Sequence, residues 1–197
     1  MLNMLLNCMI IYREEEILKG CRNGNPALQK VVYEKYAPKM YSICLRYTGN
    51  REDARDLMHD GFIKVFLNFK SYRQESTLEA WITRVIINNT LNQLRKKNKE
   101  LRNQKDYLVE LKNEYEYTED DNYLEKFTAN DIKSAILKLP QGQRTILNLY
   151  VFEDYSHKEI AKLTGISEGT SKSQLARARM TLKEILVKSK SNANELH

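Results

Sequence analysis

Apolar residues along this chain recur every three to four positions rather than at every second position. This spacing is typical of amphipathic helices, and no segment shows the alternation of a half-buried strand. Glycine and proline, which interrupt helices, number only seven and three in 197 residues. The sequence therefore predicts an all-α fold, with enough residues for one ordinary domain or two small ones.

The pattern of the first half predicts a helical domain over residues 14–98, preceded by an N-terminal extension over residues 1–13. A turn at Thr48, Gly49 and Asn50 interrupts the apolar spacing early in this domain. Around it we expect three main helices and one polar loop: helices over 26–47, 52–69 and 77–97, and the loop over 70–76.

The pattern of the second half predicts a smaller helical domain over residues 130–188, followed by a tail over residues 189–197. Its first helix can be capped by Asn130 or Asp131. Pro140 can then open the next helix, because proline is tolerated in the first turn.

A helix-turn-helix arrangement is predicted near the end of this second domain. Ser156 and Glu159 have the spacing of a capping box, which predicts a short helix over 157–163. After a break at Thr164 and Gly165, Ser167 can cap a long last helix. One face of that helix is expected to pack on the core: Ser171, Leu175, Ala178, Leu182 and Ile185. Two helices joined by so short a turn are typical of DNA-binding domains.

Charge is distributed unevenly around a net value of +6. Residues 84–105 and 133–190 carry an excess of lysine and arginine, whereas residues 106–131 are acidic. Residues 99–129 also hold too few aliphatic side chains to form a core of their own. We therefore expect a flexible acidic linker over 99–129, between two units that face a polyanionic partner.

The last helix offers polar side chains opposite Leu175, where base edges would be met in a major groove. Amide and guanidinium groups suit bidentate pairing to adenine and guanine. The candidate base contacts are Gly169, Thr170, Ser173, Gln174 and Arg177, with Lys172 and Arg179 on a flank that would reach phosphates. A solvated basic face on a helical bundle is the alternative interpretation.

Residues 137–179 read LKLPQGQRTILNLYVFEDYSHKEIAKLTGISEGTSKSQLARAR. This stretch resembles sigma-factor region 4, which implies contact with the minus-35 promoter element and adds Glu168 to the contacts. Ser171 stands where the family usually has an apolar residue, so we expect weaker packing against Ile166. Gln174 replaces the usual arginine and alters the expected base preference. Response regulators of the LuxR type carry a similar motif.

Three acidic residues on the helix expected at 52–69 share one face, whereas Phe62 and other apolar residues share the opposite face. An acidic face backed by a core suits docking to a basic partner helix, although a solvated charged face gives the same pattern. The segment DARDLMHDGFIKVFLNF resembles sigma region 2.2, which binds the clamp helices of the largest polymerase subunit. The implied polymerase contacts are Asp53, Asp56, Leu57, Asp60, Phe62 and Lys64.

The third helix carries a polar row at helical spacing, formed by Arg84, Asn88 and Asn92. Such a row would be costly if buried unpaired, so it faces either an internal hydrogen-bond network or a ligand. Amides can address base edges, and the cations Arg95 and Lys96 at its end can hold phosphates. The segment AWITRVIINNTLNQLRKK resembles sigma regions 2.3 and 2.4, which recognise the minus-10 element.

The loop SYRQEST precedes this helix, where sigma factors capture a flipped base. Capture requires stacking surface and hydrogen-bonding groups. Four loop residues offer these by their chemistry: Tyr72, Arg73, Gln74 and Glu75. Trp81 is a further candidate, though a lone tryptophan in a helical apolar pattern is more often part of the core.

Nothing in the sequence predicts a catalytic residue, a metal or a cofactor. The histidines lack ligand spacing, and neither a glycine-rich phosphate loop nor a nucleophile elbow occurs. The cysteines form no zinc or disulfide pattern, which fits a reducing cytoplasm. The apolar start over 1–12 is too short to span a membrane and lacks signal-peptide features, so no membrane insertion is expected.

The two sets of motifs occur together in the order found in sigma factors, without a larger region between them. The chain therefore resembles the extracytoplasmic-function group of sigma-70 factors. This resemblance implies core RNA polymerase and promoter DNA as partners, an anti-sigma factor as a further partner, and a role in transcription initiation without covalent chemistry. An autonomous LuxR-like regulator is the alternative, and it would bind a promoter without polymerase.

Overall fold

The computed structural model describes residues 13–104 and 127–194, in which every regular element is helical, as the sequence predicts. Contacts between Cα atoms divide the chain into two compact units. The first comprises Met1–Leu45 and Arg51–Leu94, and the second comprises Arg46–Asn50 and Arg95–His197. Residues 1–12 of the predicted N-terminal extension, most of the predicted linker and the last three residues of the tail lie outside the described residues.

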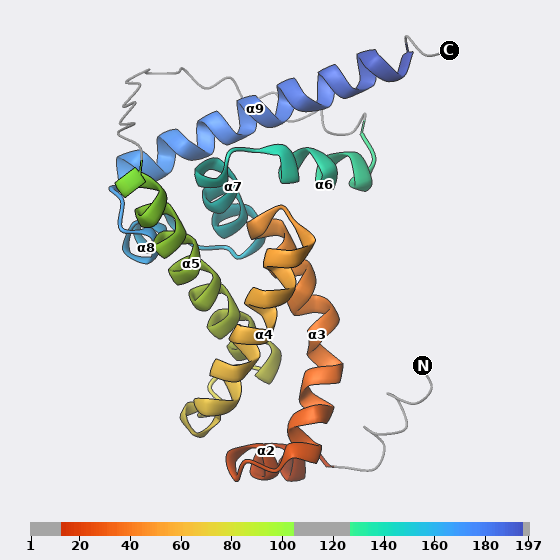
Figure 1. Cartoon of the computed structure of the whole chain (residues 1–197), viewed down its shortest axis with the longest axis vertical. Coiled ribbons are helices and arrows are strands. Elements are labelled where there is room, and N and C mark those ends of the chain that lie inside the picture. The colour runs from red at the N-terminus through yellow and green to blue at the C-terminus, as the bar shows by residue number, and fades with distance from the viewer. Residues whose placement is uncertain (1–12, 105–126, 195–197) are drawn as a thin grey trace. The chain divides into compact units, whose positions relative to one another are not determined.

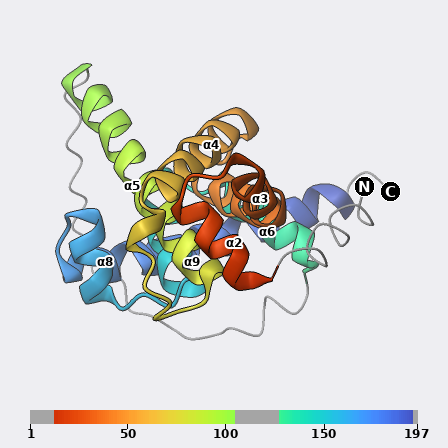
Figure 2. The same cartoon turned by 90° about the horizontal axis from the view of Figure 1, so that it is seen from below.

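The first unit is built on α2 (Glu14–Arg22), most of α3 (Pro26–Thr48), α4 (Arg51–Leu67), the short 3-10 turn η1 (Phe69–Ser71) and the part of α5 (Leu78–Gln104) that ends at Leu94. The three long helices lie side by side (Figure 1), and α2 lies across the end of α3 (Figure 2). The predicted helices over 26–47 and 52–69 are confirmed to within two residues, and the start of the helix predicted over 77–97 to within one. However, α5 continues through residues 99–104, which the sequence assigned to the linker.

The helix α2 was not among the predicted elements. It has three glutamates in its first turn, where they complement the positive end of the helix dipole. Its apolar residues Ile17, Leu18 and Cys21 are buried. At Gly20 an added Cβ would lie 2.0 Å from a methyl carbon of Leu28 on α3, so glycine permits these two helices to approach closely.

The core of the first unit lies among α3, α4 and α5. Its fully buried side chains include Met40, Val65, Ile82 and Ile86. At Gly61 on α4, an added Cβ would lie 2.5 Å from the Cδ1 atom of Ile86, so a larger residue would displace the core side chain. The close contact between α4 and α5 therefore depends on a glycine that the helical pattern did not single out.

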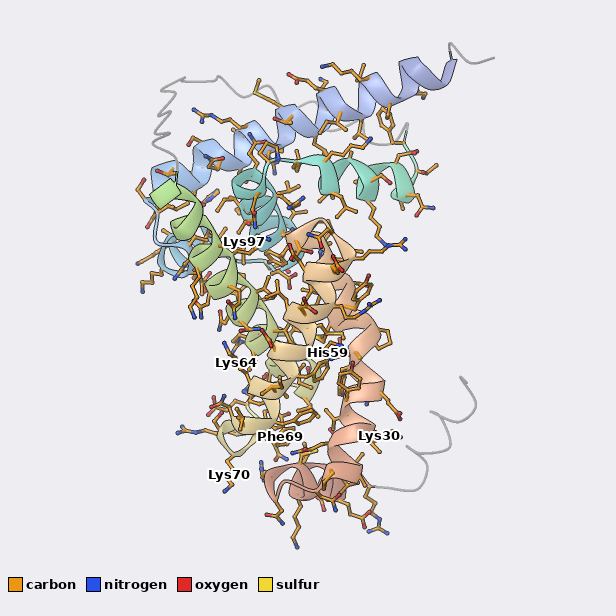
Figure 3. The ribbon with its side chains drawn as sticks, viewed as in Figure 1. Lys30, His59, Lys64, Phe69, Lys70 and Lys97 are labelled. Atoms are coloured by element: carbon orange, nitrogen blue, oxygen red, sulfur yellow. The ribbon has the colours of Figure 1, made fainter. Side chains whose placement is uncertain are left out.

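One buried asparagine links α4 to α5 through hydrogen bonds. The Asn89 side chain is 2% exposed, and its amide nitrogen donates to the Leu57 carbonyl over 3.3 Å. Lys64 reaches from the side of α4 that faces α5 (Figure 3) and donates to the Asn89 oxygen over 2.5 Å. A buried amide with both ends paired fixes the position of α5 against α4.

The second unit contains α6 (Ala129–Lys138), α7 (Gln141–Leu147), the π-helical turn η3 (Asn148–Phe152), α8 (His157–Thr164) and α9 (Glu168–Asn194). The sequence placed the cap of α6 at Asn130 or Asp131, and this was wrong. Thr128 is the cap, because its hydroxyl accepts from the Asp131 amide while the Asp131 carboxylate accepts from the Thr128 amide. The predicted capping box at Ser156 and Glu159 is confirmed.

The long helix α9 packs against α6, α7 and α8 (Figure 1). Four of the five predicted core positions on it are buried: Ser171, Leu175, Ala178 and Leu182. The fifth was misplaced, because Leu186 is fully buried and Ile185 is only half-buried. The Arg144 guanidinium donates from α7 to the Leu137 carbonyl over 2.6 Å, which ties α7 to the end of α6.

Candidate nucleic-acid interface

The acidic residues of α4 lie at the surface of the first unit. Asp56 and Asp60 are exposed, and Asp53 is half-buried. Two further residues from the predicted docking set lie beneath this face, since Leu57 is 9% exposed and Phe62 is 2% exposed. They form part of the core that supports the acidic residues.

Two exposed apolar residues extend the acidic face along α4. Ile63 is 57% exposed and Leu67 is 76% exposed. With Asp56 and Asp60 they follow the spacing of a single helix stripe, and this spacing is readable from the sequence. Ile63 and Leu67 also line a groove of about 700 Å³, which continues to Phe66 and Lys70. Sequence reasoning missed this apolar half of the face.

The structure separates the four candidate residues of the loop before α5. Arg73, Gln74 and Glu75 are exposed, whereas Tyr72 is only 5% exposed and therefore offers little surface for stacking. The Tyr72 ring packs on Trp81, with 5.3 Å between their centroids. Trp81 is half-buried. Most of its side chain therefore packs in the core, as the sequence favoured, and a smaller part reaches the surface.

The polar row of α5 faces outward from the first unit. Arg84 and Asn92 are exposed and Asn88 is half-buried. Arg95 and Lys96 at the end of the row are exposed as well. The sequence left open whether this row faces an internal hydrogen-bond network or a ligand. The internal hydrogen bonds of this helix are made by the neighbouring Asn89. The row itself is available to a ligand.

The helix-turn-helix of the second unit is formed by α8 and α9. Gly165 ends α8 with φ of 74°, a left-handed conformation that glycine adopts without strain. At the start of α9, the Ser167 hydroxyl accepts from the Thr170 amide over 3.0 Å. The predicted DNA-contacting residues are all exposed or half-buried: Glu168, Gly169, Thr170, Lys172, Ser173, Gln174, Arg177 and Arg179.

A polar contact joins the two helices of this motif at Ser171, where the sequence predicted weakened packing. The Ser171 side chain is fully buried, and its hydroxyl lies 2.9 Å from Nδ1 of His157 on α8. The His157 ring stacks on Tyr150, with 4.7 Å between centroids. A hydrogen bond thus joins the two helices at the position where the sequence predicted weaker packing, and no sequence signal connected these two residues.

The pKa of His157 is lowered, first by burial and then by the positive charge of Lys172. Arg179 acts in the same direction, whereas Glu168 opposes both. The neutral imidazole is therefore favoured in the folded unit. Neutral histidine can accept the hydroxyl hydrogen of Ser171 at Nδ1.

No catalytic arrangement emerges from the described residues. Within residues 13–104 and 127–194, no group of three His, Cys, Asp or Glu side chains could hold a metal ion. Burial raises the pKa of the Cys21 and Cys44 thiols to about 11 each, so both stay protonated and poorly nucleophilic. Among the helices described, none has both the length and the apolar character needed to cross a membrane.

Comparison with protein families matches both units to one family. Residues 32–100 match Sigma-70 region 2, and residues 129–182 match Sigma-70, region 4. Together these two matches cover more than half of the chain. The first contains the acidic face, the loop and the polar row, and the second contains the helix-turn-helix.

Curated relatives carry related names. The chain is 28% identical to the ECF RNA polymerase sigma factor SigW of Bacillus subtilis, over 86% of this chain and 94% of that protein. It is 30% identical to the ECF RNA polymerase sigma factor SigE of Mycolicibacterium smegmatis, over 86% of this chain and 65% of that protein.

The chain is also similar to a solved structure, that of the sigma factor RpoE in complex with the anti-sigma factor NepR from Bartonella quintana. The identity is 24% and the TM-score 0.49, over 80% of this chain and 95% of that one. The family matches and the curated relatives carry the assignment. The chain belongs to the extracytoplasmic-function group of the sigma-70 family and is a transcription initiation factor that directs RNA polymerase to promoters.

Proposed function

We propose that the two units are separate domains, joined by a linker, that divide promoter recognition between them. The first docks on core RNA polymerase, contacts the minus-10 element and assists its melting. The second contacts the minus-35 element. The observation that carries this proposal is the solvent-facing row of Arg84, Asn88 and Asn92, in which Asn88 is half-buried, on the helix that follows an exposed loop. Amides and cations in this arrangement suit a nucleic acid with exposed base edges.

The docking surface proposed for polymerase is the stripe of Asp56, Asp60, Ile63 and Leu67 on α4. Carboxylates favour a basic partner helix, and their charge accelerates encounter. Exposed apolar residues at the same stripe supply the area that becomes buried when the partner docks. A stripe that is both acidic and apolar favours the docking interpretation over a solvated charged face. A solvated face would not explain why Ile63 and Leu67 are exposed beside the carboxylates.

The second domain is proposed to place the first turns of α9 in the major groove at the minus-35 element. Gln174 and Arg177 have the geometry for bidentate contact with adenine and guanine. Lys172 and Arg179 lie on the flank expected to meet phosphates, which adds affinity without selecting sequence. Because each domain contributes one modest DNA contact, tethering both on one polymerase raises their effective concentration.

The decisive test of this proposal is whether promoter binding depends on core polymerase. We expect the purified chain to bind its promoter poorly alone and tightly in the presence of core polymerase. An autonomous regulator would bind equally well in both conditions, and that result would contradict the proposal. An anti-sigma partner and a cytoplasmic location remain predictions from family membership.

A paired charge reversal separates docking from general electrostatics. Replacing Asp56 and Asp60 by Lys should abolish co-purification with core polymerase, because like charges would meet at the docking helix. The matched control replaces the exposed Glu14 and Glu15 of α2 by Lys, which makes the same change in net charge. Equal core binding by both variants, with circular dichroism confirming that helical content is kept, would remove the docking assignment.

A further inference from the structure

The loop between η1 and α5 is closed by one of its own side chains. The Tyr72 hydroxyl donates to the Ser76 carbonyl over 2.8 Å, which joins the first and last residues of the segment 72–76. The exposed residues Arg73, Gln74 and Glu75 lie between these two ends. A loop whose ends are tied together has fewer conformations to lose when it binds.

The start of the loop is also held from a distant helix. Nη2 of Arg22, near the end of α2, donates to the Tyr72 carbonyl over 3.0 Å. The two residues are 50 positions apart in the chain. Tyr72 is therefore fixed at both its backbone and its hydroxyl, by two different partners.

An aromatic cluster supports the same residue from below. Phe69, Tyr72 and Trp81 contact one another, with ring centroids 5.3 to 6.2 Å apart. Phe69 is 1% exposed and lies in the lower part of the first unit, above α2 (Figure 3). Burial raises the pKa of the Tyr72 phenol, so the hydroxyl keeps the proton that it donates to Ser76.

The tip of the loop has an uncommon backbone conformation. Gln74 has φ of 61°, in the left-handed region that residues other than glycine seldom adopt. Such a conformation costs free energy and persists where the surrounding structure determines it. Here the hydrogen bonds at the two ends of the loop hold the backbone of Gln74 in this conformation. The Gln74 side chain stays exposed between Arg73 and Glu75.

We propose that Arg22 and Tyr72 are positioning residues that preset this loop to receive an unstacked nucleobase of the opened minus-10 strand. This inference rests on the proposed function of the first unit. The base meets the exposed side chains of Arg73, Gln74 and Glu75, while Tyr72 stays beneath them as the support of the loop. Preorganisation removes the cost of ordering the loop from each binding event, so its loss weakens base capture.

The test uses the full chain assembled with core polymerase and a fluorescent single strand carrying the minus-10 segment of a promoter that this holoenzyme transcribes. Affinity is measured for the intact strand and for a series in which one nucleotide at a time lacks its base. The parent holoenzyme should show one position where base removal lowers affinity most. The ratio between the two affinities at that position reports base capture and cancels general effects on binding.

Tyr72→Phe removes only the hydroxyl, and Arg22→Met removes the donor but keeps the side-chain stem. Each should lower affinity for the intact strand by roughly 2-fold to 12-fold, as expected for one lost hydrogen bond, and leave affinity for the abasic strand unchanged. Arg22→Lys retains a donor and should restore part of the ratio. Tyr33→Phe is the matched control, because it removes the hydroxyl that lies 3.4 Å from His59, away from the loop.

Three outcomes are distinguishable. A parental ratio in both folded variants overturns the positioning role. A parent holoenzyme without any position-dependent loss overturns base capture itself and, with it, the proposed role of the loop. Equal losses on intact and abasic strands show a structural role only, and this also overturns the inference. Should Tyr72→Phe lower the melting temperature of the chain, the variants Arg22→Met and Arg22→Lys, at a residue that is only half-buried, decide the question.

Discussion

The two candidate DNA-contacting regions are positioned in different ways. In the second unit, α9 is set by neighbours close in sequence: the cap at Ser167, the turn at Gly165 and the contact between His157 and Ser171, which are 14 residues apart. In the first unit, the loop and the polar row depend on contacts between distant segments, such as Arg22 with Tyr72. Local motifs are visible in a sequence, whereas long-range contacts are not. We therefore expect mutations in the core of one unit to leave the fold of the other unit intact.

The strongest destabilisation is expected at the close contact between α4 and α5. Gly61→Val would drive a side chain into Ile86, which is fully buried, and should destabilise the first unit by about 1 to 3 kcal/mol. Gly142→Val on α7 is the matched control, since an added Cβ there meets nothing within 4 Å. Hydrogen exchange should show faster opening of α4 and α5 in Gly61→Val. Equal opening of α7 and α9 in that variant would contradict the independence of the two units.

The next effect separates the buried asparagine from the exposed row on the same helix. Asn89→Ala removes the hydrogen bonds to Leu57 and Lys64 and should lower the free energy of unfolding by about 1 kcal/mol for each bond. Asn92→Ala should leave stability unchanged, because its side chain is exposed. Urea denaturation measures both. Similar losses in the two variants would mean that the row is structural and does not serve a ligand.

The smallest effect is a pH dependence confined to the second unit. Since the pKa of His157 is lowered in the folded state, the unfolded chain binds more protons below a pH of about 6.5. Stability of this unit should be full above that pH and should fall as the pH drops further. His157→Gln should remove this dependence, whereas His59→Gln on α4 should preserve it. Unfolding midpoints between pH 7.5 and 5 provide the measurement, and an unchanged slope in His157→Gln would refute the assignment.

The sequence predicted much of the fold because the relevant signals are local. The capping box at Ser156 and Glu159 spans four residues, and the structure confirms it. The cap of α6 was misplaced because Asn130 and Asp131 are themselves good caps, and only the pairing of Thr128 with Asp131 decides among them. On α9, Ile185 and Leu186 both lie close to the predicted apolar stripe, and the helical spacing alone favoured Ile185. Packing against the neighbouring helices instead buries Leu186.

The support of the candidate site could not be predicted. The sequence indicated Tyr72 as a stacking surface because an aromatic ring can stack on a nucleobase. In the structure this ring packs against Phe69 and Trp81 instead. The bond from Arg22 joins segments that no periodicity connects. Ser171 looked like a weakened contact because its partner His157 lies on another helix. In each case the sequence gives the chemistry of a side chain, and only the fold gives its partner.

If the first unit acts on opened DNA and the second on duplex DNA, variants of the two units should differ in open-complex formation on duplex and pre-melted promoters. Asn88→Ala with Asn92→Ala should keep core binding and lose open complexes on duplex DNA. Pre-melting the minus-10 segment should relieve part of that loss, because unpairing a base costs a few kcal/mol.

Arg177→Ala should instead relax selection at one minus-35 position, by about 1 to 3 kcal/mol of discrimination, and pre-melting should not restore it. Rescue of both variants to the same extent, or of neither, would contradict a division of labour between the two units.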